Sequence, residues 1–319
     1  MLSRTADHLF WMARYTERAE NTARMLDVSL QTSLLPQSEA SVELLWRGML
    51  GICELQPQYD ARYPSLAPRS VLDFMTRDPS NPSSIASCLH AARENARAVR
   101  GTLTTEVWET INATWLEMKQ RIANVEHDPG QFFEWVKYRS HLSRGVTVGT
   151  MLRDEALYFS RLGTFLERAD NTARILDVRY HALAGQGATA EDHDGGRSID
   201  FYHWTAILRS VSAFEVYRKV YSDTITPARV AELLILRPDM PRSLASCMND
   251  VVANLAQVGN AHSRETERRA GLLQADLQFG RIDVILHQGL HAYLTTFLQR
   301  VNDLADRVSR DFLVPLAAA

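Results

Sequence analysis

A 14-residue segment occurs twice in this chain, 150 positions apart. Residues 15–28 read YTERAENTARMLDV and residues 165–178 read FLERADNTARILDV, and ten of the 14 positions are identical. Packing alone would preserve the size and polarity of side chains, whereas the identical positions include individual charged and amide residues. The repeat therefore predicts an internal duplication, and its polar residues are the best candidates for a site.

Matches outside this segment extend the duplication. Trp46 aligns with Trp204 at an offset of 158, and residues 84–88 (SIASC) align with 243–247 (SLASC) at an offset of 159. A slow drift of the offset is what a few loop insertions would produce. We therefore predict one domain, 1–319, built from two helical halves, 1–150 and 151–319, that are related by a pseudo-two-fold axis.

Helical signals dominate both halves. The chain has only 15 Gly and 11 Pro among 319 residues, and no convincing run of alternating β-branched residues. We predict an all-α helical bundle with long helices at 3–34, 151–184 and 282–313. Shorter helices are expected at 41–56, 68–77, 84–101, 104–124, 131–146, 198–213, 227–236, 242–257 and 262–278. The small and polar residues 185–196 are expected to form a mobile loop.

Proline and serine mark equivalent helix starts in the two halves. Pro82 precedes Ser84, and Pro241 precedes Ser243, so that proline stops one helix and serine caps the next. The repeated Trp46 and Trp204 and the repeated Cys88 and Cys247 are expected to be core residues. On the first long helix, one apolar stripe predicts the core face; it consists of Met12, Ala19, Ala23, Leu26 and Leu30.

Composition excludes several classes of protein. A net charge of -3 argues against nucleic acid or an anionic membrane as the main partner, and no apolar run of 18 residues is present. Three scattered cysteines without a C-x-x-C pair favour a reducing cytoplasm. Glycine-rich phosphate loops are missing, which leaves nucleotide binding unsupported. We expect no cofactor and no metal, because His287 and His291 have helical i,i+4 spacing but no clear third ligand.

The repeated polar residues form a stripe on each long helix. On an ideal helix Asn21 and Arg24 lie within about 40° of Glu17, with Arg18 and Asp27 on either side. In the second copy the same positions are Glu167, Arg168, Asn171, Arg174 and Asp177. If the long helices face each other, the two stripes meet in one network.

Two interpretations of this network remain open. A buried structural network would hold the halves in register, since unpaired buried charges are costly. A ligand or catalytic site would use paired arginines to clamp a carboxylate or phosphate, with Glu17 or Glu167 as the acid or base. Whether the stripes line an open cavity or a closed interface distinguishes the two.

The repeated motif and two other segments of the chain resemble the bacterial alpha-E proteins. The resemblance rests on the doubled E-R-A-[ED]-N-T-A-R, on NPSSIASCLHAARENARAVR and on the closing LHQGLHAYLTTFLQRVNDLADRVSRDFL, and it covers essentially the whole chain. It implies an all-helical fold named for its Glu-Arg motif. Carried over by position, that signature falls on Glu17, Arg18, Asn21 and Arg24, and on Glu167, Arg168, Asn171 and Arg174.

The resemblance also implies partners. Alpha-E proteins are typically encoded beside, or fused to, a circularly permuted ATP-grasp amidoligase, often with a transglutaminase-like protease nearby. The expected function is therefore that of a helical partner or substrate-presenting subunit in the synthesis or modification of a peptide or peptide tag. One alternative is an enzyme of amide-bond chemistry that uses the duplicated Glu, Arg and Asn residues, and a second is a structural scaffold without a ligand. The oligomeric state is left open.

Overall fold

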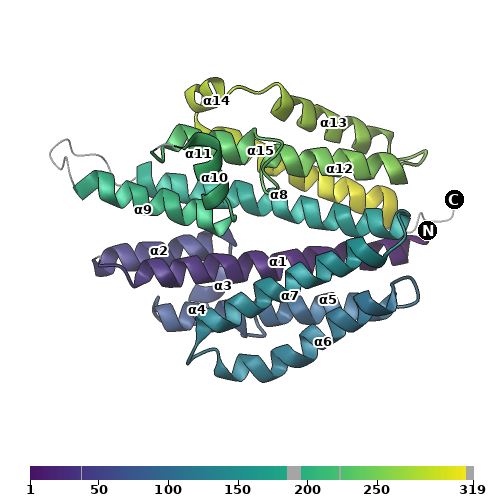
Figure 1. The fold of residues 1–319 in the computed structure, drawn as a ribbon, viewed down its shortest axis with the longest axis horizontal. Coiled ribbons are helices and arrows are strands. Elements are labelled where there is room, and N and C mark those ends of the chain that lie inside the picture. Colours follow the sequence, from purple (N-terminus) through teal and green to yellow (C-terminus); the bar gives the residue numbers. More distant parts are fainter. Residues whose placement is uncertain (37, 185–194, 223, 314–319) are drawn as a thin grey trace.

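Two long helices in the middle of the molecule organise the fold. The structure is a computed structural model, and it describes residues 1–36, 38–184, 195–222 and 224–313. Helix α1 (Ser3–Ser33) and helix α8 (Glu155–Ala184) lie side by side and run in the same direction (Figure 1). Their backbones approach closely, since a Cβ atom on Gly163 would overlap the carbonyl oxygen of Phe10. The two copies of the repeat therefore lie against each other.

The rest of the first half covers one side of this pair. Helices α5 and α7 pack on α1, and α6 lies outside them against both. Helix α2 reaches across to contact α8 as well as α1. The elements of this half after α1 are α2 (Glu39–Ile52), α3 (Gln56–Asp60), α4 (Pro68–Thr76), α5 (Ile85–Ala98), α6 (Thr105–Arg121), the 3-10 turn η1 (Ile122–Asn124) and α7 (Pro129–Thr150).

The second half covers the opposite side (Figure 1). Helices α12 and α15 pack on α8, α13 lies against both, and α9 contacts α1. A final π-helical turn, η2 (Ser309–Leu313), packs back on α1. The other elements are α9 (Gly195–Ser210), α10 (Phe214–Tyr221), α11 (Pro227–Ile235), α12 (Leu244–Val258), α13 (Arg264–Gln278), α14 (Ile282–Gln288) and α15 (Leu290–Val308).

Local contacts match at equivalent positions of the two halves. The hydroxyl of Ser84 accepts a hydrogen bond from the backbone amide of Ser87, and that of Ser243 accepts one from Ser246, as the predicted caps require. The hydroxyl of Tyr59 donates to a backbone carbonyl six residues on, and that of Tyr217 does so seven residues on. These matched contacts are what duplicated halves would show; the pseudo-two-fold axis itself stays a prediction.

The all-α fold is confirmed, since the described residues contain no strand. None of the described helices is long and apolar enough to span a bilayer. Helix α1 falls within a residue of its predicted bounds, whereas α8 starts four residues later than predicted. The short helices α3 and α10 were not predicted. Helix α9 begins at Gly195, and the rest of the predicted loop, 185–194, lies outside the described residues.

The prediction of one long helix over 282–313 was wrong. Gly289 has a φ of +99°, outside the helical region, and separates α14 from α15. A glycine adopts this conformation without the penalty that a Cβ atom brings, which is why the chain can turn there. The break falls between His287 and His291 and removes their i,i+4 helical spacing.

The core lies around α1 and α8. Trp46, Trp204, Cys88 and Cys247 are buried as predicted, and so are Met12, Ala19, Ala23 and Leu26, while Leu30 is half-buried. Because α2, α5, α7, α8 and α9 all contact α1, its polar stripe is enclosed as well. Charged residues on that stripe must therefore find partners inside the protein.

Candidate functional site

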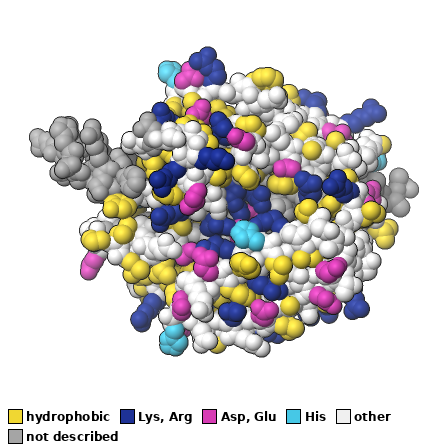
Figure 2. Space-filling view, in the orientation of Figure 1, with side chains coloured by type: hydrophobic (Ala, Val, Ile, Leu, Met, Phe, Trp, Pro, Cys, Tyr) yellow, Lys and Arg dark blue, Asp and Glu magenta, His cyan; other side chains and the backbone are white. Residues whose placement is uncertain are grey.

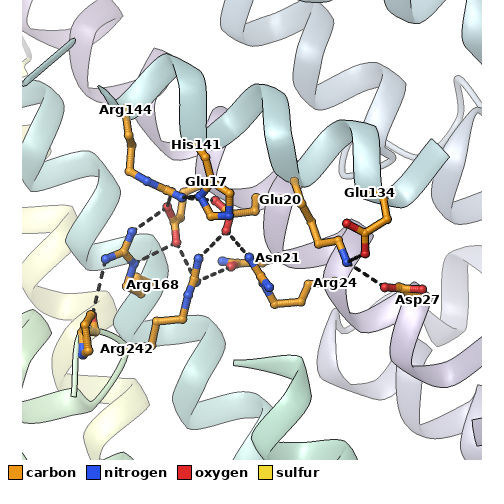
Figure 3. Close-up of polar contacts among 12 residues, drawn as sticks. Glu17, Glu20, Asn21, Arg24, Asp27, Glu134, His141, Arg144, Arg168 and Arg242 are labelled. Atoms are coloured by element: carbon orange, nitrogen blue, oxygen red, sulfur yellow. Dashed lines mark hydrogen bonds and ion pairs between the residues drawn. The ribbon is translucent and has the colours of Figure 1, made fainter. Parts of the chain in front are cut away.

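The Glu-Arg pairs of the two copies cross-link α1 and α8. The guanidinium of Arg168 donates to both carboxylate oxygens of Glu17, at 2.9 and 3.0 Å (Figure 3). Reciprocally, Arg18 donates to both oxygens of Glu167, at 2.5 and 3.0 Å. Because the helices are parallel and in register, each glutamate faces the arginine of the other copy. Two bidentate pairs of this kind are strong and geometrically specific.

Each of these glutamates also accepts hydrogen bonds from further arginines. Glu17 also accepts from Arg144 of α7 at 2.7 Å and from Arg242, just before α12, at 2.9 Å. Its carboxylate thus binds guanidinium groups from three different segments, and the residue is only 1% exposed. Glu167 accepts from Arg14 of α1 at 2.8 Å. Both carboxylates are buried in the interface between helices.

A second carboxylate on α1 extends the network. Glu20 accepts hydrogen bonds from Arg24 and from Arg242, each at 2.6 Å, and forms an ion pair with Arg144 at 2.6 Å (Figure 3). Arg242 also donates to Oδ1 of Asn21 at 2.9 Å. The side chain of Arg242 therefore bridges three polar residues of the first repeat copy, although it comes from the second half of the chain.

The buried carboxylates stay ionised. Burial by itself would raise the pKa of Glu17, but the guanidiniums of Arg168, Arg242 and Arg144 outweigh burial and hold the pKa far below its ordinary value. Burial is likewise outweighed at Glu167 by Arg14 and Arg18, so its pKa is lowered. A general base is most effective when its pKa lies near the working pH. Neither predicted acid/base residue meets this condition.

The other predicted residues lie at different places. Arg24 and Arg174 bind carboxylates of their own helices, Glu20 and Asp170, and Arg174 also pairs with Glu54 beyond the end of α2. Asp27 binds Lys137 of α7, and Asp177 binds His291 of α15, both at 2.7 Å. The two stripes thus meet around the glutamates and the neighbouring arginines, and the aspartates at their ends tie α1 and α8 to the outer helices. Asn171 belongs to a cavity described below.

Three arginines and one glutamate of the network were missed from the sequence. Glu20 belongs to the repeat, but Asp170 replaces it in the second copy, so identity alone did not select it. Arg242 follows Pro241 in a turn that was recognised only as a cap, and Ser83 stands at the matching position. The sequence carries no signal for Arg14 and Arg144, since their roles come from the packing of α8 and α7 on α1.

Two cavities border the network. One, of about 190 Å³, lies between α1, α7 and α8 beside Glu17, Arg144 and Arg168, and the rest of its lining mixes apolar side chains with Ser and Thr hydroxyls. The other, also about 190 Å³, lies on the Glu167 side and is polar. On the face shown in Figure 2, Lys and Arg side chains gather in the middle around a histidine.

The cysteine thiols and the possible metal ligands do not add a second candidate site among the described residues. Burial raises the pKa of Cys53, Cys88 and Cys247 to about 12, so these thiols stay protonated. Within the described residues, no three His, Cys, Asp or Glu side chains are placed to hold a metal ion. The arrangement can hold helices together and enclose a small polar ligand.

The fold and site define an all-helical protein whose two central helices are joined by reciprocal Glu–Arg pairs. The family model of Alpha-E, described as a predicted alpha-helical domain with a conserved ER motif, matches residues 1–313. The chain belongs to this family, as the sequence resemblance predicted. The Glu and Arg of the motif are adjacent in sequence, yet each binds the opposite copy.

Mycobacterial proteins are similar over most of the chain. Uncharacterized protein Rv2567 of Mycobacterium tuberculosis and uncharacterized protein Mb2597 of Mycobacterium bovis are each 25% identical over 342 aligned residues, which cover 95% of this chain and 36% of theirs. The chain therefore spans about a third of the length of these relatives. No solved structure matches it.

Proposed function

We propose that the protein is a non-catalytic helical subunit of an ATP-grasp amidoligase-linked system, which binds the ligase or presents its peptide substrate. The proposal of a non-catalytic role rests on the hydrogen bonding of the Glu17 carboxylate. Its carboxylate is buried and accepts four hydrogen bonds from Arg144, Arg168 and Arg242. A carboxylate so paired stabilises an interface and has no free lone pair directed at a substrate.

The enzyme alternative finds less support. Catalysis of amide-bond chemistry by Glu17 or Glu167 requires a substrate atom within hydrogen-bond reach and a pKa near the working pH. Arginine side chains bind both carboxylates, and they lower the pKa of each. The scaffold alternative shares the structural network with our proposal and differs from it in having no partner.

Two arguments favour a partner. The resemblance to alpha-E proteins brings the expectation of an ATP-grasp ligase encoded beside or fused to the chain. The mycobacterial relatives are almost three times the length of the matched region, which fits a helical unit that works next to other parts of a larger protein. The printed names of those relatives give no activity.

Co-expression tests the proposal directly. The chain is co-expressed with the circularly permuted ATP-grasp protein of the same organism, and the mixture is analysed by gel filtration with light scattering. We expect one complex of defined stoichiometry. An ATP-grasp ligase of ordinary topology serves as the control and should elute separately. Separate elution of the cognate pair would contradict the proposed partnership and leave the scaffold alternative.

A further inference from the structure

The polar cavity on the Glu167 side lies where the repeat copies differ. It is formed by α1, α8, the end of α2 and the turn before α5, and its volume is about 190 Å³. Its lining includes Arg18, Asn21, Ser83, Asp170, Asn171 and Arg174. A volume of this size is equivalent to about six water molecules, which suits a small organic ligand.

Each of four lining residues has a counterpart around Arg242. Ser83 matches Arg242 itself at the offset of 159, and Glu167, Asp170 and Asn171 match Glu17, Glu20 and Asn21 at the offset of 150. Arg242 hydrogen-bonds to all three of those α1 residues. The cavity therefore occupies the position that a guanidinium fills in the other copy. Serine is too short to fill it.

Buried polar atoms in the cavity lack partners. Among the described residues, Nδ2 of Asn21, Nδ2 of Asn171 and Oδ1 of Asp170 make no hydrogen bond. Asn21 is 2% exposed and Asn171 is 9% exposed, so both side chains are buried in the cavity wall. An unsatisfied buried polar group is destabilising, and a ligand that bonds to it would remove that penalty.

The equivalent carboxylates Glu20 and Asp170 have different numbers of arginine partners. Glu20 lies within ion-pair distance of three arginines, and Asp170 binds Arg174. Accordingly, burial raises the pKa of Asp170, whereas at Glu20 arginines led by Arg242 outweigh burial and lower it. Of the other carboxylates in the lining, Glu167 binds both Arg14 and Arg18, so Asp170 is the buried carboxylate with a single arginine partner.

The unpaired polar atoms of the cavity indicate the chemistry of the ligand. The unpaired Oδ1 of buried Asp170 calls for a cationic donor, and the two asparagine amides call for an acceptor oxygen close to it. A bare cation could not accept hydrogen bonds from Arg18 and Arg174. A carbonyl or carboxylate oxygen next to the cation could accept them. We propose that this cavity binds an α-ammonium group together with its neighbouring carbonyl oxygen, as carried by a free amino acid or by the first residue of a peptide.

The cavity is accessible from outside. Arg174 donates to Glu54 at its edge, and the side chain of Glu54 is 72% exposed. If the first residue of a peptide bound in the cavity, the following residues would extend into solvent past Glu54. The inference rests on the proposed function only in the choice of a peptide as a source of the ammonium group.

Calorimetric titration of the isolated chain tests the inference. The probes are L-alanine, trialanine amide and N-acetyl-trialanine amide. We expect a Kd below about 1 mM for at least one of the first two, and at least about tenfold weaker binding of the acetylated peptide. Binding of alanine alone identifies a free amino acid as the source, and binding of the peptide alone identifies an amino terminus. No binding of either, or equal binding of the acetylated peptide, would overturn the inference.

Variants place the ligand in the cavity. Ser83→Arg supplies the guanidinium that Arg242 supplies in the other copy, and it should weaken binding at least tenfold. Thr102→Arg adds the same side chain at the exposed turn between α5 and α6 and should leave binding intact. If Ser83→Arg does not fold, as judged by circular dichroism, Asp170→Asn decides instead and should also weaken binding at least tenfold. Unchanged binding in the deciding variant would contradict the site. Because no ligase is present, failure here leaves the co-expression result untouched.

Discussion

At the scale of single residues, Glu17 holds more of the structure together than its size suggests. Removing its charge by Glu17→Gln leaves Arg168 and Arg242, which are 8% and 6% exposed, without their main counter-charge. Breaking a buried pair from one side costs about 3–5 kcal/mol. We therefore expect Glu17→Gln to lower the free energy of unfolding by about this amount, measured by urea unfolding followed at 222 nm.

The same substitution at the surface provides a control. Glu43 pairs with Arg47 on α2, and both side chains are more than half exposed. Exposed pairs of this type contribute about 0.2–1 kcal/mol, so Glu43→Gln should unfold within that range of the unaltered chain. An unfolding midpoint for Glu17→Gln equal to that of the control would mean that the network is not structural and would revive the acid/base alternative.

The network also predicts a loss of stability in acid. The pKa values of Glu17, Glu20 and Glu167 are lowered in the folded protein from an ordinary value of 4.5. Groups with lowered pKa values bind protons more tightly when unfolded, so their contribution is complete above pH 4.5 and is lost as pH falls toward the folded values. Thermal unfolding between pH 7 and pH 3 should show the melting temperature falling mainly below pH 4.5. A melting temperature that stayed level down to pH 3 would contradict the ion-pair assignment.

At the scale of helices, the contact between α1 and α8 depends on one glycine. Gly163 faces the backbone of Phe10, where no side chain can move aside to admit a methyl group. Overpacking of a core typically costs about 1–3 kcal/mol. Gly163→Ala should therefore lower the free energy of unfolding by about that amount, despite the higher helix propensity of alanine. Gly271→Ala is the control, since nothing lies within 4 Å of a Cβ atom there, and it should be neutral or slightly stabilising.

Most helices were predictable because their signals are local. Apolar periodicity predicted α1 and its core stripe, and the proline and serine before α5 and α12 predicted where those helices begin. The break at Gly289 was not predictable in this way, since an isolated glycine in a periodic segment is often tolerated within a helix. Helix α3 has only five residues, too few to show a helical period, and α10 begins at Phe214, directly after the predicted end of the preceding helix at 213.

The site was predictable only where the sequence repeats. Identity between the copies selected Glu17, Arg18, Glu167 and Arg168, and these residues do meet. It suggested a ladder along each helix but not that each glutamate binds the arginine of the opposite copy. Arg144 and Arg242 come from segments distant in sequence, and their places follow from the packing of α7 and α12. Such partners are set by tertiary structure and have no local pattern.

At the scale of the whole molecule, the two halves share one core. Each central helix belongs to a different half, and the partner of Glu17 on α8 is separated from it by 151 positions in the chain. Separated fragments 1–150 and 151–319 would each expose a face of α1 or α8 that carries apolar residues and unpaired charges. Burying either alone is unfavourable, because the apolar face needs a cover and the charges need their partners.

We therefore expect neither fragment to form a stable monomer. Co-expressed, the fragments should assemble as a one-to-one complex with the helix content of the intact chain, since the cut falls between α7 and α8 and interrupts neither. Gel filtration with light scattering and circular dichroism measure both properties. Adding Glu17→Gln to the first fragment should weaken this complex, because three arginines then lose their shared counter-charge. Cooperative unfolding of fragment 1–150 as an isolated monomer would instead mean that the halves are independent domains.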